Sequence, residues 1–296
     1  MTDPPADVVC FGEILWDFLP DALYPGGAPL NVAYHLRRLG RRPYLVSAVG
    51  RDQLGDELLR RLRHWDIGTA GITRHADRPT GTVRASLAMR GDARYEITAD
   101  VALDQIVLSA GTRRAVGAAQ AIVFGSLAQR SAANVRALDR LLAHGRAGSW
   151  WVFDVNLRPP HDDLDLVRTL ARRATLLKLN AAEAARLADG AAEASGREET
   201  DARRLAARTG CATVCVTAGE RGAGLLRAGL WHWEPGRPVT VADTVGAGDA
   251  FLAALVNHLL NGRMPDGEVL ARACRLGEWV ASRRGATPAY DPSTPL

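Results

Sequence analysis

A glycine-rich turn that ends in a carboxylate is the feature of this chain that most directly suggests chemistry. The run Asp243-Thr244-Val245-Gly246-Ala247-Gly248-Asp249-Ala250-Phe251 leads into apolar residues at helical spacing. The first N–H groups of a helix lack intrahelical partners and lie at the positive end of its dipole, so we expect an anion such as phosphate to bind there. Gly246 and Gly248 have no Cβ and let the anion approach closely.

Asp249 would repel a phosphate bound at this turn, so its position requires a chemical reason. A carboxylate beside a phosphoryl group can accept the proton of an attacking hydroxyl. The N–H groups of Gly246, Ala247 and Gly248 would then stabilise the charge that develops on the transferred group, at about 3 to 4 kcal/mol per donor. The simpler interpretation is a turn followed by a capped helix, which requires no ligand.

A second polar cluster lies near the N-terminus. Gly26, Gly27 and Asn31 stand at an expected helix start, and Asp17 lies just upstream. Asp and Asn side chains beside glycine N–H groups suit the binding of several neighbouring hydroxyls. A turn and a helix cap would use the same residue types.

Further candidates follow a strand-like run in the second half of the chain. Asn180 would end a strand, and Glu183 would lie one turn into the next helix, although a solvent-exposed helical Glu is the alternative. Lys178 is the only lysine among 37 Lys and Arg residues. Its presence hints that the site requires a compact ammonium, with chance as the alternative.

Strand-like and helix-like segments alternate along the chain, which predicts an α/β fold with a mainly parallel central sheet and helices on both faces. The expected strands are residues 8–11, 44–49, 121–124, 150–153, 175–179 and 213–217, and examples of expected helices are residues 31–39, 53–65, 132–144 and 266–284. Ligands of such sheets bind beyond the carboxyl ends of the strands, where the polar candidates lie.

One segment has the two-residue period of a β-hairpin. Residues 82–98 alternate around an expected turn at 90–93, and with the segment near 14–24 they would form a small sheet. We expect a single α/β domain over residues 1–296 with this β lid formed by about 14–25 and 80–99. A lid would exclude water from the reaction; an edge hairpin or a homodimer contact through the lid is the alternative.

Composition limits the class of protein. The chain has 296 residues, of which 47% are hydrophobic and 24% charged, and no apolar stretch approaches the roughly 20 residues of a membrane span. Its acidic, proline-containing start does not resemble a signal peptide, so we expect a cytoplasmic protein with no membrane partner. The arginines are dispersed, so no nucleic acid is expected, and Cys10, Cys211, Cys215 and Cys274 lack zinc-site spacing.

The motifs together resemble the ribokinase-like (PfkB) carbohydrate kinases, and most closely their fructokinase branch. The run around Asp249 matches D-T-x-G-A-G-D-x-F, the cluster around Asn31 matches G-G-x-x-x-N-x-A, and Asn180 with Glu183 matches N-x-x-E. The resemblance implies an ATP-dependent kinase with Asp249 as base. It also implies sugar binding by Asp17, Gly26, Gly27 and Asn31, and Mg²⁺ organised by Asn180 and Glu183 through water.

Three supporting segments extend the resemblance. Asp154-Val155-Asn156-Leu157-Arg158 resembles the family's D-x-N-x-R, which implies that Asn156 and Arg158 lie near substrate or phosphates. Nucleotide binding is implied for Asn180, Thr217, Gly219, Gly222 and Ala286. Ligands of a monovalent cation such as K⁺ are implied at Asp243, Val245, Val280, Arg283 and Gly285. Ala289 stands where some members have a serine ligand for that cation.

The expected activity is transfer of the γ-phosphoryl group of ATP to a sugar hydroxyl, with fructose as the first acceptor to consider. Kinases for 2-keto-3-deoxygluconate, ribose or a nucleoside are alternatives, because the motifs do not determine the acceptor. A non-catalytic sugar- or nucleotide-binding regulator is the alternative of another class. The intact set of Asp249, Gly246, Gly248, Asn180 and Glu183 argues against that regulator, since a protein that only binds has no use for the base.

Overall fold

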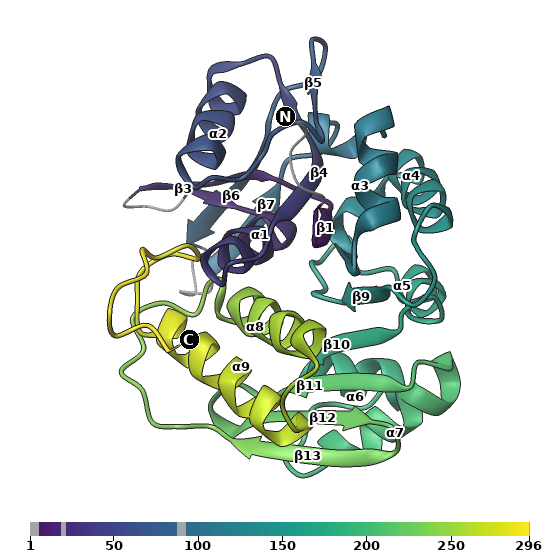
Figure 1. Ribbon diagram of the computed structural model, residues 1–296. Helices are drawn as coiled ribbons and strands as arrows, with labels where there is room; N and C mark the ends of the chain where they lie inside the picture. Colours follow the sequence, from purple (N-terminus) through teal and green to yellow (C-terminus); the bar gives the residue numbers. More distant parts are fainter. Residues whose placement is uncertain (1–5, 19–21, 88–92, 296) are drawn as a thin grey trace.

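A nine-stranded sheet forms the centre of the protein (Figure 1). The computed structural model describes residues 6–18, 22–87 and 93–295. The strand order is β13-β12-β11-β10-β9-β8-β1-β4-β5, and only β12 and β13 run antiparallel to their neighbours. The bounds are β1 (Val8–Phe11), β4 (Pro43–Gly50), β5 (Ile72–His75), β8 (Ala121–Gly125), β9 (Trp150–Asp154), β10 (Leu176–Asn180), β11 (Thr213–Thr217), β12 (Gly222–Arg227) and β13 (Leu230–Pro235). The expected mainly parallel sheet is confirmed.

Helices cover both faces of this sheet, because side chains of a strand alternate between the two faces. Val8 and Cys10 of β1 belong to a core shared with α1 (Ala28–Arg38), α2 (Gln53–His64), α8 (Ala247–Asn261) and α9 (Asp266–Ala281). Val9 and Phe11 belong to a second core on the other face. That face is covered by α3 (Ala110–Ala118), α4 (Ala132–Ala143), α5 (Leu164–Ala171), α6 (Ala181–Asp189) and α7 (Glu198–Thr209).

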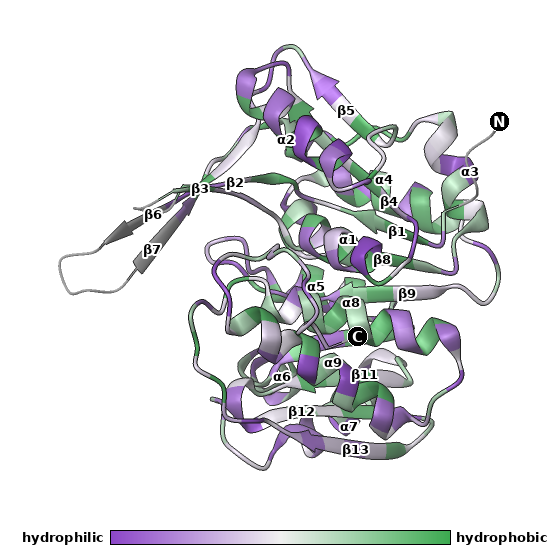
Figure 2. Cartoon of the chain, turned by 60° about the vertical axis from the view of Figure 1, so that its left-hand side comes forward, coloured by the Kyte–Doolittle hydropathy of each residue, from purple (hydrophilic) through white to green (hydrophobic). Residues whose placement is uncertain are grey.

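A separate four-stranded sheet has the order β3-β2-β6-β7. Its strands are β2 (Leu15–Phe18), β3 (Leu23–Gly26), β6 (Gly81–Leu87) and β7 (Ala93–Ile97). Figure 2 shows β6 and β7 extending away from the layers of the main body. The hairpin expected over residues 82–98 is therefore present, and residues 90–92 of its expected turn lie outside the described residues.

Several elements differ from their expected bounds. The helix expected at 31–39 already begins at Ala28, because Pro29 is tolerated in the first turn, where its missing N–H has no partner to lose. Short 3₁₀ helices η1 (Ala102–Asp104), η2 (Leu127–Arg130) and η3 (Gly219–Arg221) connect longer elements.

Within residues 6–18, 22–87 and 93–295, no helix combines the length and apolarity needed to cross a membrane.

Candidate active site

The turn before α8 has the geometry expected of an anion site. Gly246 is the N-cap of α8 and has φ 78°, in the left-handed region that favours glycine. A Cβ added at Gly246 would lie 2.4 Å from the Cβ of Ala286, so this turn packs directly on the C-terminal segment. Of the three expected N–H donors, that of Ala247 makes a long 3.3 Å bond to the carbonyl of Thr244. Residues 246–248 are partly exposed, so a ligand can reach the turn.

The two polar clusters expected from the sequence meet at one hydrogen bond. Nδ2 of Asn31, in the first turns of α1, donates to Oδ2 of Asp249 at 2.8 Å. The residues are 218 positions apart in the chain and are brought together because α1 packs against α8. Both side chains are buried, and the amide of Asn31 therefore fixes the orientation of the carboxylate.

Burial changes the acidity of Asp249. Loss of hydration and then the charge of Asp154 raise the pKa of the Asp249 carboxyl to about 6. Lys178, the bond from Asn31 and the charge of Arg158 act in the opposite direction. A base with a pKa near 6 is ionised at neutral pH and is a stronger proton acceptor than an ordinary aspartate.

The residues expected to bind the sugar lie around the start of α1, and we call this part of the site the acceptor side. They are Asp17, Gly26, Gly27 and Asn31. A Cβ on Gly26 would lie 2.0 Å from Oδ2 of Asp17, so these two expected residues are in contact across β2 and β3. Gly27 has φ 114°, and a Cβ there would lie 2.4 Å from the carbonyl oxygen of Glu13. Burial raises the pKa of the Asp17 carboxyl to about 6, with Arg158 acting against it.

Glu13 is a residue of this site that the sequence analysis did not assign. Its Oε1 accepts from the N–H of Ala28 at 3.3 Å, and its side chain is buried. Burial raises the pKa of its carboxyl to about 7, and the charges of Asp249 and Arg158 also act on it. Its position after the apolar run of β1, where site residues of parallel sheets lie, makes Glu13 a candidate from the sequence, but no motif gives it a role there.

Arg158 is exposed and follows β9. Its positive charge opposes the rise that burial causes in the pKa values of Asp17, Glu13 and Asp249. Asn156, between β9 and Arg158, has φ 42° and its carbonyl accepts from the hydroxyl of Ser126 at 3.4 Å. Arg158 thus acts on these carboxyl groups through its charge, while its guanidinium donates to the carbonyl of Leu157.

Asn180 and Glu183 form a capping box at the start of α6. Oδ1 of Asn180 accepts from the N–H of Glu183 at 2.8 Å, and Oε2 of Glu183 accepts from the N–H of Asn180 at 2.9 Å. Oε1 of Glu183 accepts from the N–H of Leu157 at 2.7 Å. Glu183 therefore fixes the loop that carries Arg158. Because both of its oxygens already accept a hydrogen bond, this donor set suits Mg²⁺ held through water better than direct coordination.

Lys178 of β10 and Asp154 of β9 form a buried ion pair. They are register partners in the sheet, and Nζ of Lys178 lies 3.0 and 3.2 Å from the two carboxylate oxygens of Asp154. The side chains are 9% and 3% exposed. A Cβ on Gly248 would lie 3.2 Å from Nζ, so the ammonium lies directly beneath the turn before α8.

Comparison with known proteins identifies the family of the chain. The description "pfkB family carbohydrate kinase" matches residues 7–292. The chain belongs to the PfkB family of carbohydrate kinases. The expected family, fold and kinase class are thereby confirmed.

Several relatives span nearly the whole chain. The chain is 31% identical over 272 residues to a Pyrococcus horikoshii protein named "Putative sugar kinase PH1459", covering 90% of this chain and 84% of that protein. The crystal structure of PH1459 in complex with ATP has a TM-score of 0.77, with 95% of this chain and 94% of that one covered. A fructokinase of Klebsiella pneumoniae is 30% identical over 295 residues, covering 94% of each chain. A Xylella fastidiosa fructokinase with bound ATP, 22% identical, has a TM-score of 0.83 over 95% of this chain and 94% of that one and shares the fold.

The candidate cation ligands of this PfkB kinase come from two segments that Asp243 joins. Its Oδ1 accepts from the N–H of Val245 at 3.0 Å, and its Oδ2 accepts from the N–H of Gly285 at 3.1 Å. The carbonyl of Val280 accepts from the N–H of Arg283. The five expected residues thus lie in the loop before α8, at the last turn of α9 and in the segment that follows it. Cation binding there is a proposal.

The expected nucleotide residues of this PfkB kinase lie at two places. Thr217 ends β11, while Gly219 and Gly222 flank η3 and have φ values of 59° and 119°. Ala286 lies against Gly246. Thr217 and Asn180 are register partners on neighbouring strands, so the Asn180 end of the site continues into the β11 loop.

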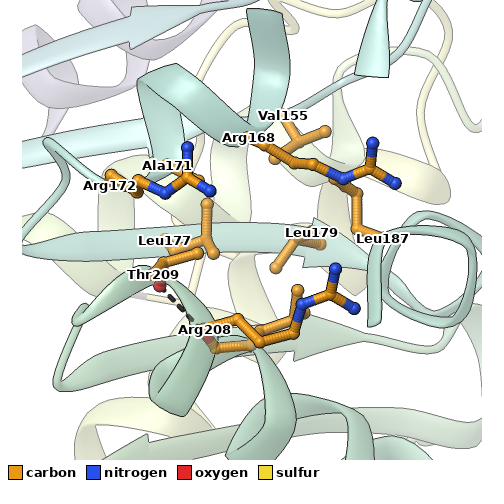
Figure 3. Close-up of a pocket in the computed structure, with 10 residues that line it drawn as sticks. Val155, Arg168, Ala171, Arg172, Leu177, Leu179, Leu187, Arg208 and Thr209 are labelled. Atoms are coloured by element: carbon orange, nitrogen blue, oxygen red, sulfur yellow. Dashed lines mark hydrogen bonds between the residues drawn. The ribbon is translucent and has the colours of Figure 1, made fainter. Parts of the chain in front are cut away.

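A small cavity of about 30 Å³ lies on the opposite face of the sheet (Figure 3). Leu177 and Leu179 of β10 form its floor, and the guanidinium groups of Arg168, Arg172 and Arg208 surround it. A space of this size holds about one or two water molecules and no nucleotide. It is separate from the site, because Leu177 and Leu179 point away from the face that carries Lys178.

Proposed function

We propose that this protein transfers the γ-phosphoryl group of ATP to a hydroxyl of a sugar, with fructose as the acceptor. The observation that carries the proposal is the 2.8 Å bond between Asn31 and Asp249, since it joins the sugar-binding cluster to the expected base. A protein that only binds sugar or nucleotide has no need of this contact.

Two buried oxygen atoms support a polyhydroxy ligand. Oδ1 of Asn31 and Oε2 of Glu13 are buried and have no hydrogen-bond partner among the residues that the structure describes. Unpaired buried polar atoms are rare because each costs about 1 to 3 kcal/mol. Glu13 accepts from the N–H of Ala28 and Asn31 lies in the first turns of α1, so sugar hydroxyls bound at the start of this helix would satisfy these oxygens.

In the proposed reaction, the residues of the chain align the groups and move one proton. Oδ2 of Asp249 already accepts a hydrogen bond from Asn31, so Oδ1 is left to act as the base. Oδ1 accepts the proton of the sugar hydroxyl as the hydroxyl oxygen bonds to phosphorus. Asp17 and Arg158 hold the acceptor against the base. The N–H groups of Gly246 and Gly248 stabilise the developing charge, which a fixed donor does without reorganisation.

When bound, MgATP supplies the phosphoryl group, and ADP leaves as the bond from the γ-phosphorus to the β,γ-bridging oxygen breaks. Asn180 and Glu183 would hold Mg²⁺ through water, and Asp243 with the nearby carbonyls would hold a monovalent cation. We further propose that the small sheet of β2, β3, β6 and β7 closes over the acceptor and excludes water. A homodimer contact through this sheet is the other proposed use of it.

Fructose is favoured as the acceptor because the fructokinase of Klebsiella pneumoniae is 30% identical over nearly the whole chain. The test is ADP release from the purified protein with MgATP, with and without K⁺, in the presence of fructose, ribose, 2-keto-3-deoxygluconate or adenosine. The matched control is Asp249→Ala, which keeps the turn and removes the base.

Release with fructose alone, lost in Asp249→Ala while ATP still binds, would support the whole proposal. Release with another acceptor would retain the mechanism and replace fructose. Turnover that persists in Asp249→Ala would refute Asp249 as the base. Binding of ATP and sugar without release on any acceptor would instead favour the non-catalytic regulator.

A further inference from the structure

Lys178 is the one lysine of the chain, and its ammonium is buried where charge is expensive. The even positions of β10 face the core that contains α8, since Leu176 belongs to that core and Leu177 and Leu179 to the other. Lys178 therefore points toward the start of α8. Its place against Gly248 follows from this geometry.

The pair with Asp154 fixes the ammonium there. Nζ contacts both carboxylate oxygens at 3.0 and 3.2 Å from a neighbouring strand, so the group cannot swing away without leaving a buried charge unpaired. An arginine guanidinium is larger and planar, and the close approach to Gly248 leaves little room for it.

Acidic groups outnumber this ammonium around Asp249. Lys178 interacts with the carboxylates of Asp154, Asp249 and Glu183, and together these raise its pKa although burial alone would lower it. The groups that act on or face Asp249 are Asn31 from α1, Lys178 from β10, Asp154 from β9, Arg158 from the loop after β9, Glu13 from the end of β1 and Asp17 from β2. Of the two cations, Arg158 is exposed and Lys178 is buried beneath the turn.

We propose that Lys178 is a positioning residue of the catalytic turn: held by Asp154 against Gly248, it supplies the fixed positive charge that keeps Asp249 ionised and able to accept a proton. The inference rests on the proposed function, because it gives Lys178 a part in the same reaction. It requires the ammonium to act on the carboxylate through space, without contact with the acceptor.

The kinetic test is the pH profile of kcat/KM between pH 5 and 9. Lys178→Met should move the acidic limb of this profile to higher pH by about one pH unit, because loss of an opposite charge disfavours the ionised carboxylate of Asp249. The rate relative to the unchanged protein then falls nearly tenfold at low pH, and the loss no longer changes with pH above about 8.5. Asp154→Asn should move the limb downward, and the double variant should return it close to its original position. Lys178→Arg keeps the charge and should keep the limb in place even where kcat falls.

A second measurement does not depend on turnover or on the variants of Lys178. Protein labelled with [ε-¹³C]lysine gives a single lysine signal, since the chain has one lysine. Its chemical shift should change with a midpoint near pH 6, where Asp249 ionises, and this transition should be absent in Asp249→Asn. The variant keeps the hydrogen-bonding shape of the side chain and removes its charge.

The outcomes separate the two proposals. A rate loss in Lys178→Met that is equal at every pH, or a lysine signal with no transition assignable to Asp249, would overturn the role of Lys178 even if sugars are phosphorylated. A transition that disappears in Asp249→Asn, in a protein that phosphorylates none of the acceptors, would support the electrostatic coupling and refute the proposed function.

Discussion

At the scale of single residues, the site concentrates carboxyl groups that burial makes less acidic. The pKa values of Asp17 and Asp249 are raised to about 6 and that of Glu13 to about 7, in each case chiefly by loss of hydration. The amide of Asn31 donates to the carboxylate of Asp249 and so opposes the rise in its pKa. The identity of the residue at position 31 therefore affects the acidity of Asp249.

Asn31→Asp tests this dependence with a change of one polar group. A carboxylate at position 31 would lie about 3 Å from Asp249, and two carboxylates at this distance share a proton, so one pKa of the pair rises strongly. We expect kcat at pH 7 to fall about 10²- to 10⁴-fold, the range associated with loss of a general base. Raising the pH should restore part of the rate. Steady-state kinetics from pH 6 to 9 measures both effects. A decrease in kcat of the same size at every pH would contradict the explanation.

Gly246→Ala tests the contact between the turn and the C-terminal segment. The new Cβ would lie 2.4 Å from the Cβ of Ala286 at φ 78°, so we expect loss of turnover and a free energy of unfolding lower by more than the roughly 1 to 2 kcal/mol of left-handed strain. Gly262→Ala at the other end of α8 is the matched control. Its φ is 61° and nothing lies within 4 Å of its added Cβ, so the loss of unfolding free energy in this variant comes from backbone strain alone. Urea unfolding compares the two, and equal losses would argue against the packing role of Gly246.

At the scale of elements, the sequence predicted the buried strands well and the edge strands poorly. The six expected strands are present because each is built mainly of apolar residues, although Ser47 interrupts β4 and Lys178 interrupts β10. β12 and β13 were not expected. Gly222 and Gly224 interrupt β12, and β13 at the sheet edge consists only of half-exposed and exposed residues. β5 is likewise short and only partly buried.

The site was predictable only in part for a related reason. Polar residues after apolar runs identified Asn180 and, through its motif, Asp249, because strand ends and helix starts are local features. The bonds from Asn31 to Asp249 and from Lys178 to Asp154 depend on which helix packs on which and on strand register. No spacing along the chain encodes those contacts.

Helix α1 also holds the C-terminal segment, through His35. Its Nε2 lies 2.9 Å from the carbonyl of Ala286, which can only accept, so Nε2 carries the proton and Nδ1 accepts from the hydroxyl of Tyr290. Burial lowers the pKa of His35 to about 4. Since this folded-state value lies below the unfolded value of about 6.5, the stability that His35 contributes is present above pH 6.5 and is lost as the pH falls toward 4.

His35→Leu should therefore be less sensitive to acid than the unchanged protein. At pH 7.5 the variant should be less stable, because the carbonyl of Ala286 loses its donor. Between pH 7.5 and 4 the difference in unfolding free energy should shrink by about 3 kcal/mol, the linkage expected of a shift of this size. Urea unfolding at several pH values measures it.

Tyr34→Phe is the control for that experiment. It removes the 2.8 Å bond from the Tyr34 hydroxyl to the carbonyl of Pro288, also between α1 and the C-terminal segment, without removing an imidazole. Its loss of about 1 kcal/mol should be the same at every pH tested. A His35→Leu difference that is likewise independent of pH would show that protonation of His35 does not matter to folding.

At the scale of the whole molecule, two sheets of different kinds meet at the acceptor side of the site. The large sheet is covered by helices on both faces, whereas the hairpin of β6 and β7 extends away from it (Figure 2). Asp17 lies on β2 of the small sheet and Asn31 on α1 of the main body, so an acceptor held by both would join the two parts. Movement of the small sheet relative to the main body is therefore expected to depend on the acceptor.

Hydrogen exchange can test whether the acceptor closes the small sheet. With fructose and a non-hydrolysable ATP analogue, backbone amides of β2, β3 and β6 should exchange more slowly, because closure protects amides that open locally in the free protein. The analogue alone should slow exchange chiefly around the start of α8. Asp17→Asn should weaken binding of the acceptor to the small sheet. In this variant the additional protection by fructose should be lost, while the protection by the analogue remains. Protection of the small sheet that rises with protein concentration in the absence of fructose would instead identify the sheet as a contact between two copies of the chain.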